Sequence, residues 1–374
     1  MLGNHESKDG ADRFCRQYLQ QERDLDYPSA AVLQEAYTQN LLYERLFADG
    51  AVAYPPPPRY RLRVLKELVK RIEASIDDWD QYGVSDDLMS SLSELLALPL
   101  PSELAAAQQK SYVTYSPSLL DQSRPSSSPH QITLLESRNL ISAAGTTGLR
   151  TWEAALHLGQ YLCTNPALIQ GKRMLELGAG TGYLSILCAK FLETTQVIAS
   201  DGSDDVVANL PDNFFVNGLQ DSERISAMDL KWGYGLMGTE EAEWNGGRPI
   251  DIVLGADITY DKSIIPALAG TLDDLFGMFP EVKILIAATE RNRETFDAFL
   301  DVCQGRNFAV DEVNFKFNNA IEASLLRDAF SVVHPKHKIP HSYRKCSAQF
   351  MSRIGVTKGF LDRQMCNRLG VLVA

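Results

Sequence analysis

The segment MLELGAGTGYLSILCAK, residues 174–190, constrains the fold of this chain more than any other part of its sequence. An apolar run with a carboxylate near its end leads into three closely spaced glycines and then into a second apolar run. This order predicts a strand, a tight turn and a helix, as in a βαβ unit. Such a turn lets the backbone come close to a nucleotide-like ligand.

Apolar runs of strand length recur around this motif, and several are separated by segments with helical spacing. The strand-like runs are RMLEL, QVIAS, RISAM, IDIVLGA and KILIAA, and the helix-like segments include SDDVVANLPDNFFVNG and RNRETFDAFLDVCQG. This alternation predicts an α/β fold with a mostly parallel sheet and helices on both faces. In such a sheet a ligand binds beyond the carboxyl ends of the strands, near the point where the strand order reverses.

The first part of the chain has a different pattern, which is typical of helices. In RYRLRVLKELVKRIEASIDDW, residues 59–79, apolar residues recur near helical spacing directly after a run of four prolines. We expect the helical region either to stabilise the rest of the chain as a cap or to dock a substrate. The predicted parts are a helical domain over 1–120, a Ser/Pro-rich linker or loop over 121–130, an α/β domain over 131–315 and an atypical tail over 316–374.

Composition and charge narrow the possible partners and locations. The net charge of −12 argues against nonspecific binding to nucleic acid and would attract a basic protein surface. The polar N-terminus MLGNHESKDG does not resemble a signal peptide, and no apolar run reaches the roughly 18 residues that could span a bilayer. The six cysteines include no C-x-x-C pair. We therefore expect a cytoplasmic chain without membrane partners, with reduced thiols that mostly serve packing.

The glycines and the acids near them suit a cofactor. Gly178 and Gly180 let the backbone turn and approach a ligand, and Gly182 opens the next helix. Glu176 precedes the turn, where a carboxylate could attract a cationic amine. Asp201 ends the next strand and could accept hydrogen bonds from both hydroxyls of a ribose.

The spacing of the glycines separates two cofactors. A dinucleotide fingerprint needs G-x-G-x-x-G, and its last position is Tyr183 here. S-adenosylmethionine carries no pyrophosphate, so it needs the close turn and the acids without a phosphate cradle. We favour this methyl donor over NAD, and an oxidoreductase remains an alternative.

Two further strands end in acids at the same predicted edge of the sheet. In AMDLKWG, Asp229 could accept a hydrogen bond from an adenine amine while Leu230 or Trp232 covers the ring. A surface turn with a buried tryptophan is an equally good interpretation of that segment. In GADITYD, Asp257 and Tyr260 lie at the end of the fourth strand.

Four motifs together resemble the seven-β-strand protein-lysine methyltransferases. They are TTGLRTWEAALHLGQYL, LELGAGTGYLSI, the D-x-x-Y of GADITYD, and ERNRETFDAFL. The similarity is greatest to the branch that methylates translation elongation factor 2, and it includes YLQQERDLDYPS and NLLYERLF in the helical region. The resemblance implies a Rossmann-like seven-strand sheet, S-adenosyl-L-methionine as cofactor and elongation factor 2 as protein substrate. We expect a monomer that binds no nucleic acid directly.

The resemblance also assigns roles to individual residues. Those that it places at the cofactor are Trp152, Glu153, Glu176, Gly178, Ala179, Gly180, Thr181, Gly182, Asp201, Asp229, Trp232 and Ala256. Asp257 and Tyr260 would face the lysine, where Asp257 orients the amine and Tyr260 shields the site. No metal is needed for this reaction. For Trp152, a position in a helix core is the alternative.

The tail departs from the family pattern after DEVNFKFNN, where a last hairpin of the sheet is expected. We expect no clear strand there until GVLVA at the end of the chain. His334, His337 and His341 are interpreted as solvated residues of a basic tail, in preference to metal ligands. A methyltransferase for another protein or a small molecule, and a noncatalytic scaffold with this fold, remain alternative functions.

Overall fold

The structure is a computed structural model, and it divides the chain into two compact units. It describes residues 2–123, 130–138, 147–234, 236, 244–289, 293–313, 315, 330–335 and 369–373. The first unit comprises residues 1–150 with 212–218, and the second comprises 151–211 with 219–374. The boundary expected within 121–130 stays a prediction, because residues 124–129 lie outside the described part.

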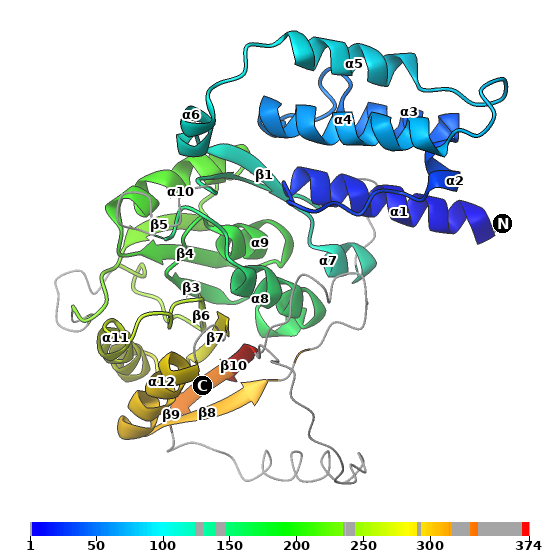
Figure 1. Cartoon of the computed structure of the whole chain (residues 1–374). Coiled ribbons are helices and arrows are strands. Elements are labelled where there is room, and N and C mark those ends of the chain that lie inside the picture. The colour runs from blue at the N-terminus through cyan, green and yellow to red at the C-terminus, as the bar shows by residue number, and fades with distance from the viewer. Residues whose placement is uncertain are drawn as a thin grey trace. The chain divides into compact units, whose positions relative to one another are not determined.

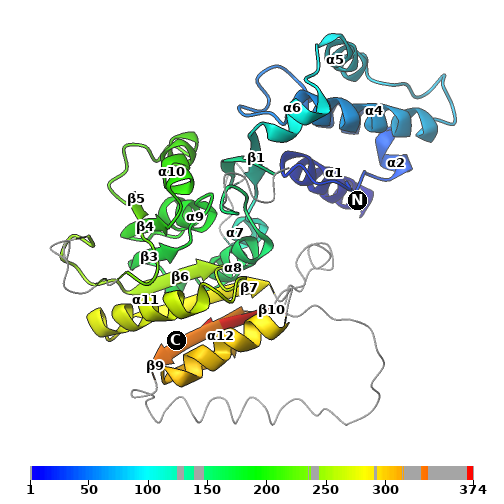
Figure 2. The ribbon, with the colours of Figure 1, turned by 60° about the vertical axis from the view of Figure 1, so that its left-hand side comes forward.

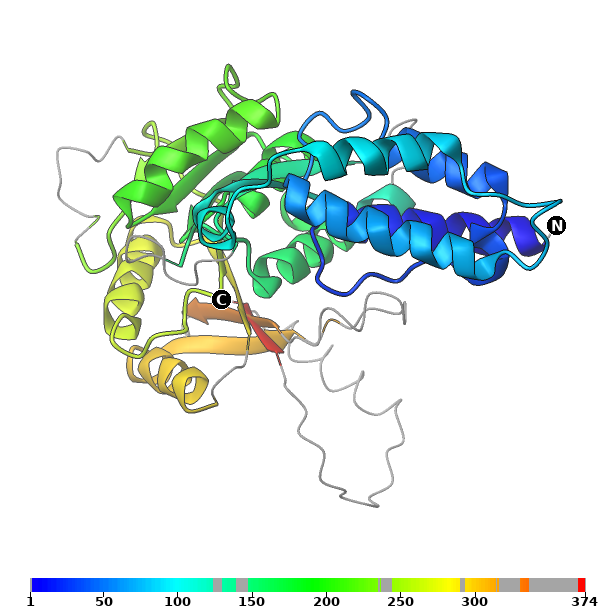
Figure 3. The ribbon, with the colours of Figure 1, turned by 45° about the horizontal axis from the view of Figure 1, so that its top comes forward.

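The first unit contains a group of helices and a two-stranded hairpin (Figure 1). Its helices are α1 (Leu2–Leu19), α2 (Ala30–Leu33), α3 (Ala36–Leu46), α4 (Pro58–Ser75), α5 (Asp86–Ala97), α6 (Glu103–Gln108) and α7 (Ser118–Ser123). Strands β1 (Ser111–Tyr115) and β2 (Ile132–Glu136) pair antiparallel. Figure 3 shows α1, α4 and α5 side by side within this unit. The predicted N-terminal helical region is present.

Helix α4 organises the core of this unit. It starts at Pro58. Proline lacks a backbone N–H, and it is tolerated there because the first N–H groups of a helix have no partner within the helix. Its stripe of Val64, Leu65, Leu68 and other apolar residues is buried in a cluster with side chains from α1, α3 and α5. The helical spacing of the sequence therefore produces one buried face and one polar face.

The second unit alternates strands and helices, as the sequence predicts. Its helices are α8 (Glu153–Thr164), the 3-10 helix η1 (Pro166–Leu168), α9 (Tyr183–Phe191), α10 (Asp204–Val216, whose last turn belongs to the first unit), α11 (Ile265–Met278) and α12 (Arg293–Gly305). Its strands are β3 (Arg173–Leu177), β4 (Gln196–Asp201), β5 (Ile225–Asp229), β6 (Ile252–Ala256), β7 (Lys283–Thr289), β8 (Phe308–Val313), β9 (Phe330–Pro335) and β10 (Leu369–Val373). In Figure 2, α8 and α9 lie on one side of this sheet and α11 and α12 on the other.

Five parallel strands form the centre of the sheet in the order β7-β6-β3-β4-β5. The chain moves from β3 through β4 to β5 on one side, and then crosses to β6 and β7 on the other. The strand order therefore reverses between β3 and β6, and the ends of these strands form the expected ligand edge. Register adds detail to this edge, because Asp201 of β4 lies opposite Asp229 of β5.

Three strands near the C-terminus extend the sheet beyond β7. β10 runs antiparallel to β7 along its whole length, which confirms the strand expected at GVLVA. The expectation of no earlier strand was wrong, because β9 pairs antiparallel with β8 from Phe330 to Pro335. The apolar run of β9, FSVVHP, is short, and it is not adjacent in the sequence to β8, the strand with which it pairs. The local sequence pattern therefore did not indicate this strand. The remainder of 316–374 lies outside the described residues.

Three expectations from the sequence concern the cysteines, membrane spans and metal ligands, and the structure bears on them within its described residues. Its four cysteines, Cys15, Cys163, Cys188 and Cys303, are buried free thiols. No helix in that part is long and apolar enough to cross a membrane. No group of three potential metal ligands occurs among the described residues. His337 and His341 lie outside them.

Candidate active site

Three glycines shape the turn between β3 and α9. Gly178, Gly180 and Gly182 have φ angles of 65°, 54° and 83°, a left-handed conformation that favours glycine. A Cβ atom on Gly178 would lie 2.7 Å from the side chain of Ile258. The turn therefore needs glycine both for its backbone angles and for its close packing.

Asp201 is fixed beside this turn. Its carboxylate accepts hydrogen bonds from the amide of Gly180 at 3.1 Å and from the amide of Ser203 at 3.0 Å. Burial raises the pKa of Asp201, and these amides oppose the rise. A carboxylate is thus held at a defined position at the end of β4, as the sequence predicts.

The turn after β5 brings Trp232 against the glycines. A Cβ on Gly178 would lie 3.5 Å from the indole ring, so the ring covers the turn closely. The indole nitrogen is buried and finds no hydrogen-bond acceptor among the described residues. Leu230, in contrast, is 4% exposed and belongs to the core of the sheet. Trp232 therefore has a donor at this edge without an acceptor in the described part of the chain, whereas the side chain of Leu230 packs into the core.

Asp229 has a more open environment than Asp201. Its carboxylate is about half exposed and lies 3.3 Å from Nζ of Lys231, which also contacts Asp204 at 3.1 Å. Ion pairs at such exposed positions contribute little stability, so a ligand can replace them at small cost. Asp229 lies next to Asp201 in the register of the sheet, and its contact with the adenine stays a prediction.

The start of α8 is tied to the glycine turn through a pair of threonines. The hydroxyls of Thr151 and Thr181 lie 2.6 Å apart, and both residues are buried. Trp152 is the N-cap residue of α8 and Glu153 its first residue, and both are partly buried. The hydrogen bond between Thr151 and Thr181 therefore holds the segment with Trp152 and Glu153 beside the glycine turn. Thr151 was not among the residues predicted from the sequence.

Glu176 faces the interior. It is 2% exposed, and its carboxylate accepts a hydrogen bond from the hydroxyl of Ser185 in α9. Burial raises the pKa of Glu176 to about 8. In the structure this side chain connects β3 to α9 behind the turn. Its predicted contact with a cationic amine stays a prediction.

Asp257 occupies an unusual backbone conformation just after β6. Its φ is 54°, which costs a residue other than glycine about 1–3 kcal/mol. Its carboxylate accepts hydrogen bonds from the amide of Thr289 at 2.7 Å and from the hydroxyl of Thr289 at 3.0 Å. Its own amide donates to the carbonyl of Ala287 at 2.7 Å. Asp257 is therefore fixed to the end of β7.

The other residues of this edge differ in exposure. Ala256 ends β6 and is partly buried, and Ala179 in the glycine turn is 7% exposed. The ring of Tyr260 is exposed, at 57%. Its role as a shield of the lysine stays a prediction. The segment 290–292, part of the ERNRETFDAFL motif, lies outside the described residues.

Comparison with known proteins identifies the family. Residues 134–305 match a family model described as lysine methyltransferase. The protein-lysine N-methyltransferase EFM3 of Chaetomium thermophilum is 60% identical over 303 residues, which are 81% of this chain and 89% of that protein. The human protein-lysine N-methyltransferase EEF2KMT is 30% identical over 70% of this chain and 74% of the human protein. EFM3 of Saccharomyces cerevisiae is 33% identical over 52% of this chain and 60% of the yeast protein.

The chain belongs to the protein-lysine N-methyltransferases. This confirms the resemblance found in its motifs, and S-adenosyl-L-methionine is the cofactor of the enzyme. The structure fits this cofactor at two points. The amide of Gly180 holds the carboxylate of Asp201 at the glycine turn, where it could accept from ribose hydroxyls, and the buried N–H of Trp232 lacks an acceptor within the described part of the chain.

Proposed function

We propose that this methyltransferase transfers methyl groups to a lysine of translation elongation factor 2, as a monomer in the cytoplasm. Two observations support elongation factor 2 as the substrate. The motifs resemble that branch of the family, and a human relative has the name EEF2KMT. The observation that carries the assignment of the lysine site is the fixed Asp257 of the D-x-x-Y motif, next to the switch point of the sheet.

We assign the cofactor to the edge formed by β3, β4 and β5. Asp201 would hold the ribose hydroxyls, while Asp229 and Trp232 would border the adenine. Thr181 and the glycines would allow close approach, and Trp152, Glu153 and Ala256 would complete the wall. When bound, the cofactor would supply a methyl group carried on a sulfonium: the lysine nitrogen would bond to the methyl carbon as the carbon–sulfur bond breaks, and a neutral thioether would leave.

The residues near β6 and β7 would handle the lysine. An amine must be neutral to attack, and lysine has an ordinary pKa of about 10.4. A nearby carboxylate favours the ammonium form, so Asp257 is assigned to binding and orientation. Holding an amine in line with the methyl group accounts for much of the expected rate. Tyr260 would exclude water at the rim.

The test is transfer of labelled methyl groups from S-adenosylmethionine to purified elongation factor 2, with mass spectrometry to locate the modified residue. We expect a labelled lysine with the natural enzyme and a large loss with Asp257→Ala. Asp201→Ala should instead weaken cofactor binding, which calorimetry measures. Cofactor binding without transfer to elongation factor 2 would contradict the proposed substrate and favour another acceptor or a scaffold.

A further inference from the structure

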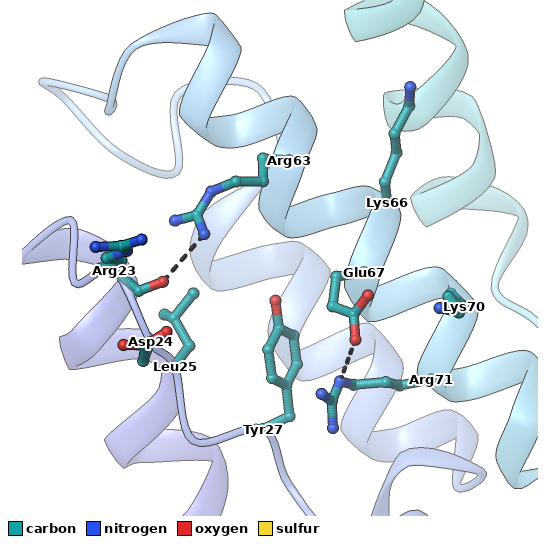
Figure 4. Close-up of a pocket in the computed structure, with 9 residues that line it drawn as sticks. All are labelled: Arg23, Asp24, Leu25, Tyr27, Arg63, Lys66, Glu67, Lys70 and Arg71. Carbon is teal, nitrogen blue, oxygen red and sulfur yellow. Dashed lines mark hydrogen bonds and ion pairs between the residues drawn. The ribbon is translucent and has the colours of Figure 1, made fainter.

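The helical unit has a groove of its own, between α4 and the connection from α1 to α2. This basic groove has a volume of about 490 Å³ and is lined by Arg23, Asp24, Leu25, Tyr27, Arg63, Lys66, Glu67, Lys70 and Arg71 (Figure 4). Five of these side chains are cationic and two are acidic, which gives a net charge of +3. The whole chain has a net charge of −12. The groove therefore concentrates positive charge on an otherwise acidic protein.

The periodicity of α4 produces this concentration. Arg63, Lys66, Lys70 and Arg71 recur at positions i, i+3, i+7 and i+8, which lie along one side of a helix. All four are exposed, whereas the apolar stripe of α4 is buried in the core. The cations thus lie together because the helix must turn its apolar side inward.

Two of the guanidinium groups are held in place. Arg63 donates to the carbonyl of Arg23 at 3.0 Å and lies 5.0 Å from the centre of the Tyr60 ring. Arg71 lies 4.4 Å from the centre of the Tyr27 ring. Fixed guanidinium groups lose little conformational freedom when they bind a carboxylate, and the N–H groups that these contacts leave unused can donate to one.

The remaining cations are not neutralised. Among the described residues, the side chains of Arg23, Lys66 and Lys70 make no ion pair or hydrogen bond, while Glu67 pairs with Arg71 at 2.8 Å. Like charges gathered in one groove repel one another. An anionic ligand would relieve this repulsion.

We infer that the basic groove binds an acidic segment of a partner protein, rich in aspartate and glutamate. Nucleic acid fits less well, because single strands bind through bases stacked on open aromatic faces. Here Arg71 and Arg63 lie over the rings of Tyr27 and Tyr60. The acidic remainder of the chain would also repel a long phosphate backbone more than a short peptide. This site goes beyond the proposed methyl transfer, since its occupant need not be methylated.

The test is fluorescence anisotropy on the full chain without S-adenosylmethionine, using a labelled peptide of alternating glutamate and glycine. The same peptide with glutamine is the neutral control, and a short single-stranded RNA is the competing ligand. Lys66→Gln combined with Lys70→Gln removes two charges from the groove. Lys172→Gln combined with Lys283→Gln removes two exposed charges from the α/β unit and is the matched variant.

We expect the acidic peptide to bind, the glutamine peptide not to bind, and added salt to weaken binding. The groove variant should weaken binding by about 10-fold, and the matched variant by less than about 2-fold. Equal weakening by both variants, no binding at all, or tighter binding of RNA through the same lysines would each overturn the inference. Circular dichroism of both variants excludes misfolding as the cause. The assay includes no methyl donor or acceptor, so its outcome is independent of the proposed methyl transfer.

Discussion

The two halves of the candidate site use the same backbone conformation with different residues. In the turn after β3, the left-handed positions are Gly178, Gly180 and Gly182. In the turn after β6, the left-handed position is Asp257, with the same φ of 54° as Gly180. Glycine adopts this conformation without a steric cost, whereas aspartate tolerates it at a cost that is smaller than for most other residues. The side chain at Asp257 comes with backbone strain, which agrees with the role proposed above for its carboxylate.

The hydrogen bonds from Thr289 explain how the strained turn persists. They offset part of the backbone cost and fix the carboxylate at the end of β7. Strained residues of this kind tend to occur at functional sites. The glycine turn is then expected to govern cofactor affinity, and the aspartate turn to govern transfer to lysine.

Substitution of Gly178 should have the largest effect on methyl transfer. Gly178→Ala would place a Cβ 2.7 Å from Ile258 in a left-handed backbone, so we expect a loss of about 2–4 kcal/mol of stability and of most cofactor affinity. Gly171→Ala is the matched control, because Gly171 has a φ of 70° and open space around it. That control should lose only about 1–2 kcal/mol and bind the cofactor normally. Equal affinities in calorimetry would refute the role of the turn.

Substitutions of Asp257 should separate strain from chemistry. Asp257→Ala keeps the strain and leaves the donors of Thr289 without their acceptor, so we expect a loss of about 1–3 kcal/mol. Asp257→Gly relieves the strain and should be more stable than the alanine variant by about 1 kcal/mol. Both variants should lose about 100-fold in turnover. If the glycine variant were the less stable in thermal unfolding, strain at this position would be excluded.

Thr289 offers a smaller and more specific effect, because only one of its two bonds depends on its side chain. Thr289→Val removes the hydroxyl bond to Asp257 and should cost about 1 kcal/mol, with a several-fold fall in kcat and little change in KM for S-adenosylmethionine. Thr289→Ser keeps the hydroxyl and should restore most of the kcat. A serine variant as slow as the valine variant would show that packing, and not the hydroxyl, matters at this position.

Substitution of Glu176 should have the smallest effect on methyl transfer and the largest effect on the pH dependence of folding stability. The pKa of Glu176 in the folded chain is about 8, against an ordinary value of 4.5. Between these two pH values the folded state therefore keeps a proton on this carboxyl group that the unfolded state has released. Stability should therefore fall as pH rises from about 4.5 to 8. Glu176→Gln keeps an acceptor for Ser185 and should reduce this slope in unfolding measured at several pH values. A larger loss of cofactor affinity than in Gly178→Ala would instead support direct contact with the cofactor.

The sequence predicted the features that depend on residues close together in the chain. The glycine turn and the acids at strand ends follow from local patterns, because a strand that ends in an acid places it at the sheet edge. The bonds Thr151–Thr181 and Asp257–Thr289 join residues 30 and 32 positions apart, so no local pattern indicates them. The inward direction of Glu176 was also hidden, since every residue of β3 is buried and alternation gives no signal.

The most direct test of the division between the two turns is Asp257→Asn. Asparagine tolerates the left-handed conformation. Its single carbonyl oxygen can accept from the amide of Thr289 and its NH2 group can donate to the hydroxyl of Thr289, so the change removes the charge while both contacts are kept. The measurement is calorimetric binding of S-adenosylmethionine together with single-turnover transfer to elongation factor 2. We predict affinity within about 3-fold of the natural enzyme and transfer slower by about 100-fold. Affinity and transfer reduced by the same factor would contradict the account, since Asp257 would then belong to the cofactor site.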